Sequence, residues 1–195
     1  GELPSDLNEC DAWLITGSRH DAYSDIPWIL ALRDWIRRAH DANVKLAGIC
    51  FGHQVIAQAL GGEVVKSTKG WGLGVSVHPM QEAKPWMQPG LETIRILASH
   101  QDQVEQLPPG ATLLAGNDFC PNFMFLQGDH IVAIQGHPEF SVEYNRALIE
   151  RRRDRLPDEH YQSSLSSLEG EVDSATMMQR LLQFLGMLPV GPAVR

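Results

Sequence analysis

The sequence predicts an α/β fold with three layers, in which a mostly parallel central sheet lies between flanking helices. Short apolar runs of strand length alternate with longer stretches whose apolar residues recur at helical spacing. The 195 residues are 43% hydrophobic and 21% charged, an ordinary globular composition. A chain of this length fits one domain with a single core, so we assign residues 1–195 to one domain.

The first part of the chain supplies two strand–helix units. The apolar run Trp13–Ile15 stops at Thr16-Gly17, as a buried strand does when it ends in a turn. A helix is predicted over residues 27–40, because proline suits the first helical position and apolar residues follow at helical spacing. Residues 44–49 predict a second buried strand, and the helix after it is closed by Gly61-Gly62.

The middle of the chain differs from both ends. Between residues 63 and 125, short β-like pieces are interrupted by glycine and proline, which favours a small antiparallel segment built from hairpins. Residues 131–134 predict another short buried strand. Two helices are expected over residues 142–155 and 174–185, with the serine-rich stretch 163–167 as a loop between them.

Composition and charge exclude several classes of binding partner. A formal net charge of −8 repels phosphate backbones, so we expect no nucleic-acid partner, and the basic residues 151–155 are interpreted as a solvated helix face. No apolar run approaches the roughly 20 residues that cross a bilayer, and the acidic start does not resemble a signal peptide. The three cysteines contain no CxxC pair, which fits a reducing cytoplasm better than a disulfide framework or a zinc site. No motif indicates a metal or an organic cofactor.

The strongest local signal is Gly48-Ile49-Cys50-Phe51-Gly52, a G-x-C-x-G pattern between a predicted strand and a predicted helix. A tight turn of this kind holds its central residue in a strained conformation, and side chains at the glycine positions would collide with neighbouring backbone. The partial positive charge at the helix N-terminus favours the thiolate of Cys50. The alternative is a buried structural cysteine beside two incidental glycines.

A nucleophile needs a base and a group that orients it. His137 and Glu139 follow the predicted strand 131–134, and Pro138 between them holds the segment extended. Residues two apart in extended chain face the same side, and the carboxyl ends of parallel strands meet at one edge of a sheet. A lone His-x-Glu is more often a surface pair, but together with the elbow it predicts a Cys-His-Glu triad of Cys50, His137 and Glu139.

These motifs together resemble the class I, or triad, glutamine amidotransferases. That family has a cysteine elbow followed by His-Gln, here residues 50–54, and a distal His-Pro-Glu, here residues 137–139. Residues 99–104, SHQDQV, are similar to the SHxDxV segment of the amidotransferase domain of GMP synthases. The family resemblance runs from about Asp11 to the helix after Glu139, and residues 17–21 and 69–74 are most similar to those of small stand-alone GMP-synthase-like amidotransferases.

The resemblance implies a flavodoxin-like, amidotransferase-type fold and a mechanism. Cys50 would attack the side-chain carbonyl of glutamine, His137 would protonate the departing ammonia, and water would then hydrolyse the glutamyl thioester. The backbone N–H groups of Gly17 and Phe51 would bind the oxyanion, and donors of this kind contribute about 3 kcal/mol each.

The resemblance also implies substrate contacts and partners. Gln54 matches a substrate-contacting position, and Ser99, His100 and Gln101 would offer backbone groups to the amino-acid end of glutamine. For His100, a structural hydrogen-bonding role is an equal alternative. We expect no synthase domain that could use the ammonia, so a separate synthase or acceptor subunit is the expected partner.

Two departures from the family pattern stand out. Many members have phenylalanine before the catalytic histidine, where this chain has Gly136. Members normally open with a strand–helix–strand unit ahead of the strand at Trp13–Ile15, and the 12 residues before Trp13 are too few for such a unit, so we expect it to be absent.

Two other functions remain open on the sequence. γ-Glutamyl hydrolases share the expected fold and nucleophile, so a γ-glutamyl amide or peptide is an alternative substrate. A non-catalytic binding or regulatory module with the same fold is the alternative from a different class.

Overall fold

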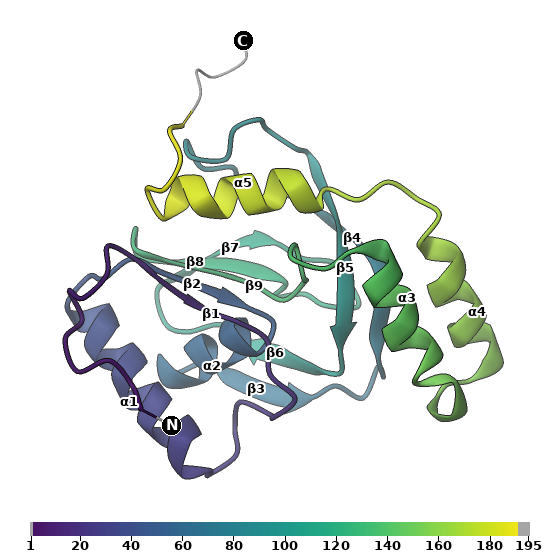
Figure 1. The fold of residues 1–195 in the computed structure, drawn as a ribbon, viewed down its shortest axis with the longest axis horizontal. Coiled ribbons are helices and arrows are strands. Elements are labelled where there is room, and N and C mark those ends of the chain that lie inside the picture. The colour runs from purple at the N-terminus through teal and green to yellow at the C-terminus, as the bar shows by residue number, and fades with distance from the viewer. Residues whose placement is uncertain (1, 191–195) are drawn as a thin grey trace.

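The computed structural model describes residues 2–190 of the 195-residue chain. Its centre is a five-stranded sheet in the order β1-β2-β9-β8-β7 (Figure 1). The strands in that order are β1 (Trp13–Ile15), β2 (Leu46–Ile49), β9 (Ile131–Ile134), β8 (Met124–Gln127) and β7 (Ala111–Ala115). The first three are parallel, so their carboxyl ends meet at one edge of the sheet.

Helices cover both faces of this sheet. Helices α1 (Pro27–Asp41) and α2 (Phe51–Ala59) lie on one face, and α5 (Ser174–Phe184) lies on the other (Figure 1). Alternate strand residues point to opposite sides: Leu46 packs with the α1–α2 core, whereas Ile49 packs with the α5 core. The prediction of a three-layer α/β fold is therefore confirmed.

The central sheet is mixed, although a mostly parallel sheet was expected. Strand β8 is antiparallel to both β7 and β9. The connection from β8 to β9 is a tight turn in which Gly128 has a φ of +57°. A turn this short cannot return the chain to a parallel strand, which needs a crossover of a dozen or more residues.

The small antiparallel segment is confirmed as two strand pairs. Strand β4 (Gly72–Pro79) pairs with β5 (Thr93–His100), and β3 (Glu63–Lys66) pairs with β6 (Asp102–Gln106). Only Gln101 separates β5 from β6, so the chain turns sharply at the end of the SHQ segment. Strand β6 was not predicted as a separate element, because most of its residues are polar.

Two shorter helices, α3 (Val142–Glu150) and α4 (Asp158–Ser167), lie beside the β4–β5 pair (Figure 1). Helix α3 ends earlier than the expected residue 155, and a 3₁₀ turn, Arg153–Arg155, follows it. The extended conformation of Leu156, with ψ at 141°, completes the break, and the following Pro157 favours that conformation.

The prediction of a loop over residues 163–167 is wrong, because this serine-rich stretch forms the second half of α4. The serine hydroxyls do not compete with the helix here. Ser164 donates to the carbonyl of His160 at 2.7 Å, and Ser167 donates to that of Ser164 at 2.7 Å. Ser167 also accepts from the backbone amide of Val75 at 2.9 Å, which fastens α4 to β4. Packing on the sheet thus outweighs the weak helix propensity of serine.

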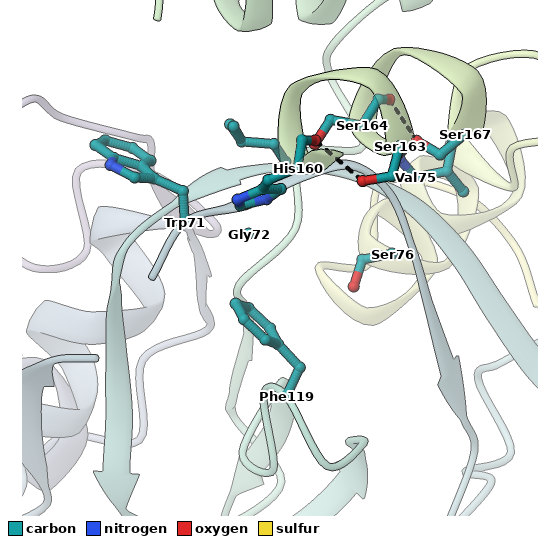
Figure 2. Close-up of a pocket in the computed structure, with 10 residues that line it drawn as sticks. Trp71, Gly72, Val75, Ser76, Phe119, His160, Ser163, Ser164 and Ser167 are labelled. Carbon is teal, nitrogen blue, oxygen red and sulfur yellow. Dashed lines mark hydrogen bonds between the residues drawn. The ribbon is translucent and has the colours of Figure 1, made fainter. Parts of the chain in front are cut away.

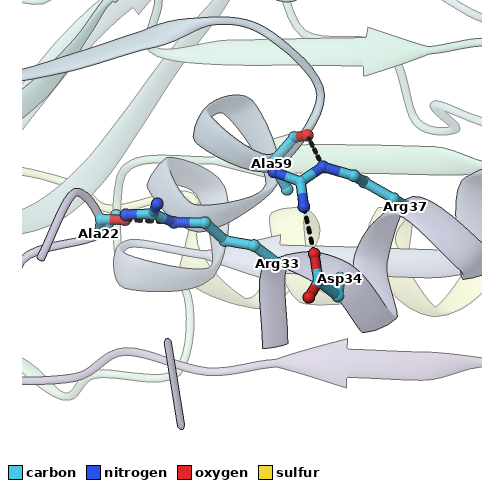
Figure 3. Close-up of polar contacts among 5 residues, drawn as sticks. All are labelled: Ala22, Arg33, Asp34, Arg37 and Ala59. Atoms are coloured by element: carbon cyan, nitrogen blue, oxygen red, sulfur yellow. Dashed lines mark hydrogen bonds and ion pairs between the residues drawn. The ribbon is translucent and has the colours of Figure 1, made fainter. Parts of the chain in front are cut away.

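Arginines on α1 fix the segments next to the parallel strands (Figure 3). Buried Arg33 donates to the carbonyl of Ala22 through Nε at 3.1 Å and Nη2 at 2.6 Å. Arg37 donates to the carbonyl of Ala59, the last residue of α2, at 2.9 Å and pairs with Asp34 on its own helix. These contacts tie α1 to the loop after β1 and to the end of α2.

Residues 2–12 contain no helix and no strand. Within residues 2–190, β1 is the edge of the central sheet and pairs only with β2. Across the same range, every helix falls short of the length and apolar character needed to cross a membrane.

Candidate active site

Cys50 lies at the sharp turn from β2 to α2, with φ at +52° and ψ at −101°. Gly48 and Gly52, two residues to either side, stand at positions where a side chain would clash with neighbouring atoms. A Cβ on Gly52 would lie 2.1 Å from the carbonyl oxygen of Ile15, and one on Gly48 would lie 2.5 Å from the Cδ1 atom of Ile56. The sequence therefore forms a strained elbow that presents the thiol at the carboxyl edge of the parallel strands.

His137 and Glu139 follow β9, the strand next to β2, and they line one cavity together with Cys50. The backbone amide of His137 donates to the carbonyl of Leu97 at 2.8 Å, which anchors the loop on β5. Its Nδ1 lies 2.7 Å from Oε1 of Glu139, and its side chain lines the same cavity as Cys50. The ring of Phe140 stacks on the imidazole, with the centroids 3.9 Å apart and the planes 9° from parallel.

The charge state of His137 follows from these contacts. Burial alone would lower its pKa, but the neighbouring Cys50 and the hydrogen-bonded carboxylate of Glu139 raise the pKa to about 9. The imidazole is therefore protonated at neutral pH. A protonated imidazole beside a cysteine stabilises the thiolate and holds a proton that it can pass to a leaving group.

The two predicted oxyanion donors lie next to this group. A Cβ on Gly17 would lie 3.2 Å from Cε1 of His137 and 3.8 Å from Cβ of Cys50, so the Gly17 backbone borders both side chains. Phe51 is the first residue of α2, and the amide of a first helical residue has no partner within the helix. The structure thus gathers the predicted groups, while their role as donors stays a prediction.

Two cavities of about 370 Å³ each meet at Cys50. The first, called here the Gln54 cavity, is lined by all four predicted substrate-contacting residues, namely Gln54, Ser99, His100 and Gln101. The second, called here the His137 cavity, is lined by His137, Glu139 and Gly17 and by side chains of α3. The nucleophile therefore has room on both sides.

Hydrogen bonds within the protein fix the side chains of two residues predicted to contact the substrate, Gln54 and His100. Nε2 of Gln54 donates to the carbonyl of Asp102 at 2.8 Å and to Oε1 of Gln135 at 3.0 Å, which leaves its own Oε1 for a ligand. Nδ1 of His100 lies 3.2 Å from the same Asp102 carbonyl. Burial lowers the pKa of His100 to about 4, so this side chain is neutral, in keeping with a structural role.

Several residues that line these cavities were not predicted. Arg19 and Arg152 line both, and Tyr144 and Leu148 of α3 line the His137 cavity. The interpretation of residues 151–155 as a solvated face is wrong for Arg152, which is half-buried with its guanidinium 4.5 Å from the centre of the Trp71 ring. The break after α3 turns Arg152 inward, and nothing in the local sequence indicates that break except Pro157.

A third cavity, of about 280 Å³, lies between β4 and α4 and is separate from this group (Figure 2). Trp71 lies at the border between this cavity and the Gln54 cavity. Figure 2 shows the serines of α4 above His160, and their hydroxyls already donate to backbone carbonyls within the helix. None of the residues predicted for the site lines this cavity.

A metal centre would need several ligating side chains in one place. Among residues 2–190, no three His, Cys, Asp or Glu side chains are grouped so that they could hold a metal ion. The groups that meet at Cys50 are those of nucleophilic and acid–base chemistry.

Fold and site together define the class of protein. The sequence model of the family described as glutamine amidotransferase class-I matches residues 7–153, so the chain belongs to that family. This agrees with the family to which the motifs are similar. The family includes hydrolytic enzymes, among them glutamine amidotransferases and γ-glutamyl peptidases.

Individual relatives refine the comparison. The chain is 40% identical to γ-glutamyl peptidase 4 of Arabidopsis thaliana over 158 residues, which are 77% of this chain and 63% of that protein. It is 38% identical over 99 residues to one subunit of the glutamine-hydrolysing GMP synthase of Thermococcus kodakarensis, covering 50% of this chain and 52% of that one. The crystal structure of a glutamine amidotransferase from Thermotoga maritima superposes with a TM-score of 0.76 at 22% identity, covering 94% of this chain and 82% of that one. The chain spans less than two thirds of the length of the curated relatives named here.

Proposed function

We propose that this protein is a thiol hydrolase that cleaves the amide bond at the γ-carbonyl of a glutamyl group, with glutamine as the first candidate substrate. The observation that carries the proposal is the gathering of Cys50, His137 and Glu139 on one cavity, with Nδ1 of His137 2.7 Å from Oε1 of Glu139 and Cys50 at the junction with a second cavity. Residues of these types in contact are the parts of a nucleophilic triad.

The reaction proceeds in two balanced steps. The sulfur of Cys50 bonds to the amide carbon, the C–N bond breaks, and His137 transfers its proton to the nitrogen, which leaves as ammonia. Water then attacks the thioester carbon while His137 takes a proton from it, and the C–S bond breaks. Glutamine and water thus become glutamate and ammonia, and Cys50 and His137 regain their starting states.

The negative oxygen of each tetrahedral intermediate would be bound by the amides of Gly17 and Phe51, which flank the thiol. Glu139 would keep the imidazole in the orientation that serves both steps, because it holds Nδ1 and leaves Nε2 for the reaction. If the ammonia is used rather than released, a separate synthase or acceptor subunit would have to receive it.

A γ-glutamyl peptide is the second candidate substrate, and a specific observation favours it. The chain is 35% identical to γ-glutamyl peptidase 3 of Arabidopsis thaliana over 159 residues and 40% identical to γ-glutamyl peptidase 4 of the same plant over 158 residues. The chemistry is the same for both substrates, since only the amine that leaves differs.

The test is the release of glutamate from glutamine and from γ-glutamyl dipeptides by the purified protein, beside a Cys50→Ala variant. We expect release that is absent from the variant, and rapid alkylation of Cys50 by a glutamine analogue that carries an electrophilic ketone. A folded protein that releases no glutamate from either substrate and does not react with the analogue would contradict the proposal and favour a non-catalytic binding module.

A further inference from the structure

The two cavities that meet at Cys50 differ in their charge and in their position relative to the acid. The Gln54 cavity is lined by Asp21, Asp102 and Lys66, a mixture of charges that suits the α-ammonium and α-carboxylate of a glutamyl group. His137, which gives its proton to the leaving amine in the proposed mechanism, lines only the other cavity. The leaving group therefore departs on the His137 side.

The His137 cavity is much larger than ammonia requires. Its volume is about 370 Å³, whereas one molecule of the size of water occupies only about 10–15 Å³. Its outer wall is formed by Phe140, Tyr144 and Leu148, and Tyr144 has 52% of its surface exposed. An apolar side chain on the leaving group would cover this wall and remove it from water.

The same cavity contains a positive charge without a counter-ion. Arg152 is half-buried, and within residues 2–190 no carboxylate lies within 4.0 Å of its guanidinium. It donates to the carbonyl of Leu148 at 2.8 Å and stacks on Trp71, so its position is fixed. Burial, together with the charges of Arg151 and Arg155, lowers its pKa, which means that an anion placed beside it would be bound favourably.

From these observations, and resting on the proposed function, we infer that the His137 cavity is a subsite for an amino-acid leaving group. The substrate that would fill this subsite is the second candidate, a γ-glutamyl peptide, with an apolar residue after the glutamyl group. Its side chain lies against Tyr144 and Leu148, and its carboxylate, one carbon away from the departing nitrogen, is bound by Arg152 with help from exposed Arg19. Both arginines line the cavities at their junction with Cys50, where that carboxylate would lie.

The test compares three substrates: glutamine, γ-glutamyl-leucine and γ-glutamyl-isoamylamide, whose leaving amine is leucine without its carboxylate. We expect the wild-type protein to cleave γ-glutamyl-leucine with a kcat/KM about tenfold above that of the isoamylamide, as a charged hydrogen bond would give. Arg152→Gln should lower the ratio of kcat/KM for γ-glutamyl-leucine to kcat/KM for glutamine about tenfold. Arg151→Gln, a matched change at an exposed neighbour that lines neither cavity, should leave this ratio unchanged.

Three results would overturn the inference. Equal kcat/KM values for γ-glutamyl-leucine and the isoamylamide on the wild-type protein would show that the cavity does not bind the carboxylate. This comparison does not depend on the folding of any variant. A loss in Arg152→Gln that is equal for glutamine and γ-glutamyl-leucine would place the guanidinium at the glutamyl end instead. Failure to cleave any of the three substrates would overturn the proposed function itself, and is distinguishable from the other two results.

Discussion

Replacing Glu139 by glutamine tests the electrostatic design of the site. The change removes a carboxylate whose Oε1 lies 2.7 Å from Nδ1 of His137 and leaves an amide of similar size. Because the carboxylate is one of the groups that raise the pKa of His137 to about 9, the substitution should lower that pKa. The imidazole would then lose its proton closer to neutral pH.

The size of the effect follows from distance and exposure. Two unit charges about 4 Å apart interact by about 1 kcal/mol in water and by about 4 kcal/mol at an effective dielectric constant of 20. The Glu139 side chain is 34% exposed and that of His137 is 6% exposed, so solvent screens the pair from one side. We therefore take a value near the lower limit, about 1.4 kcal/mol, which corresponds to a fall of about one pKa unit.

The assay is the pH dependence of kcat/KM for glutamate release, together with an NMR titration of the His137 ring. In the wild-type protein, activity should fall as pH rises through about 9, because the proton for the leaving amine is lost. In Glu139→Gln, the basic limb of the pH profile, where activity falls, should move down by about one pH unit. The value of kcat should also fall about tenfold or more, because the imidazole loses its orienting partner.

The free energy of unfolding should also fall as pH rises through the pKa of His137. The pKa of His137 is raised above its ordinary value of 6.5, so protonation favours the folded protein. This contribution is fully present below pH 6.5 and is lost as pH rises through about 9. In thermal unfolding measured as a function of pH, Glu139→Gln should lose this stabilising contribution at a lower pH than the wild-type protein. An unchanged basic limb together with an unchanged His137 titration in the variant would refute the reasoning.

Three further predictions concern packing and thiol reactivity. Gly52→Ala would place a Cβ 2.1 Å from the carbonyl oxygen of Ile15, and the forced shift of α2 should lower kcat/KM about a hundredfold, measured beside a circular dichroism control. Gly136→Phe would bring a Cβ within 2.8 Å of Cζ of buried Phe123, so urea titration should show a loss of about 1–3 kcal/mol in the free energy of unfolding. Cys120 is 1% exposed and burial raises its pKa to about 12, so iodoacetamide should label it only after unfolding. Peptide mapping that finds native labelling of Cys120 would contradict this last expectation.

The position of Cys50, His137 and Glu139 on one cavity was predictable because each half of this group is encoded locally. The elbow around Cys50 needs its two glycines within five residues, and Pro138 fixes the relation of His137 to Glu139. Each half also follows a short, wholly apolar strand, and β2 and β9 are neighbours in the sheet. The meeting of the two halves then follows from a general property of parallel strands rather than from any detail of this chain.

Other features depend on tertiary contacts that short sequence patterns do not carry. Helix α4 forms from poor helix formers because its serines satisfy their hydroxyls internally and Ser167 binds the amide of Val75 on β4. The inward turn of Arg152 depends on the break after α3 and on Trp71, which is distant in sequence. Strand β6 carries only one apolar residue, Val104, and is defined by its pairing with β3.

The backbone at Cys50 has a consequence for how such a chain evolves. With φ at +52° and ψ at −101°, the residue lies outside the regions that side-chain-bearing residues favour, at a cost of about 1–3 kcal/mol. Glycine would relieve that strain, although it loses about 0.5–1 kcal/mol through the greater freedom of the unfolded chain. Replacing Cys50 by glycine should therefore raise the free energy of unfolding by up to about 2 kcal/mol while it removes the proposed nucleophile. Reactivity and stability would then make opposite demands on the residue at this one turn.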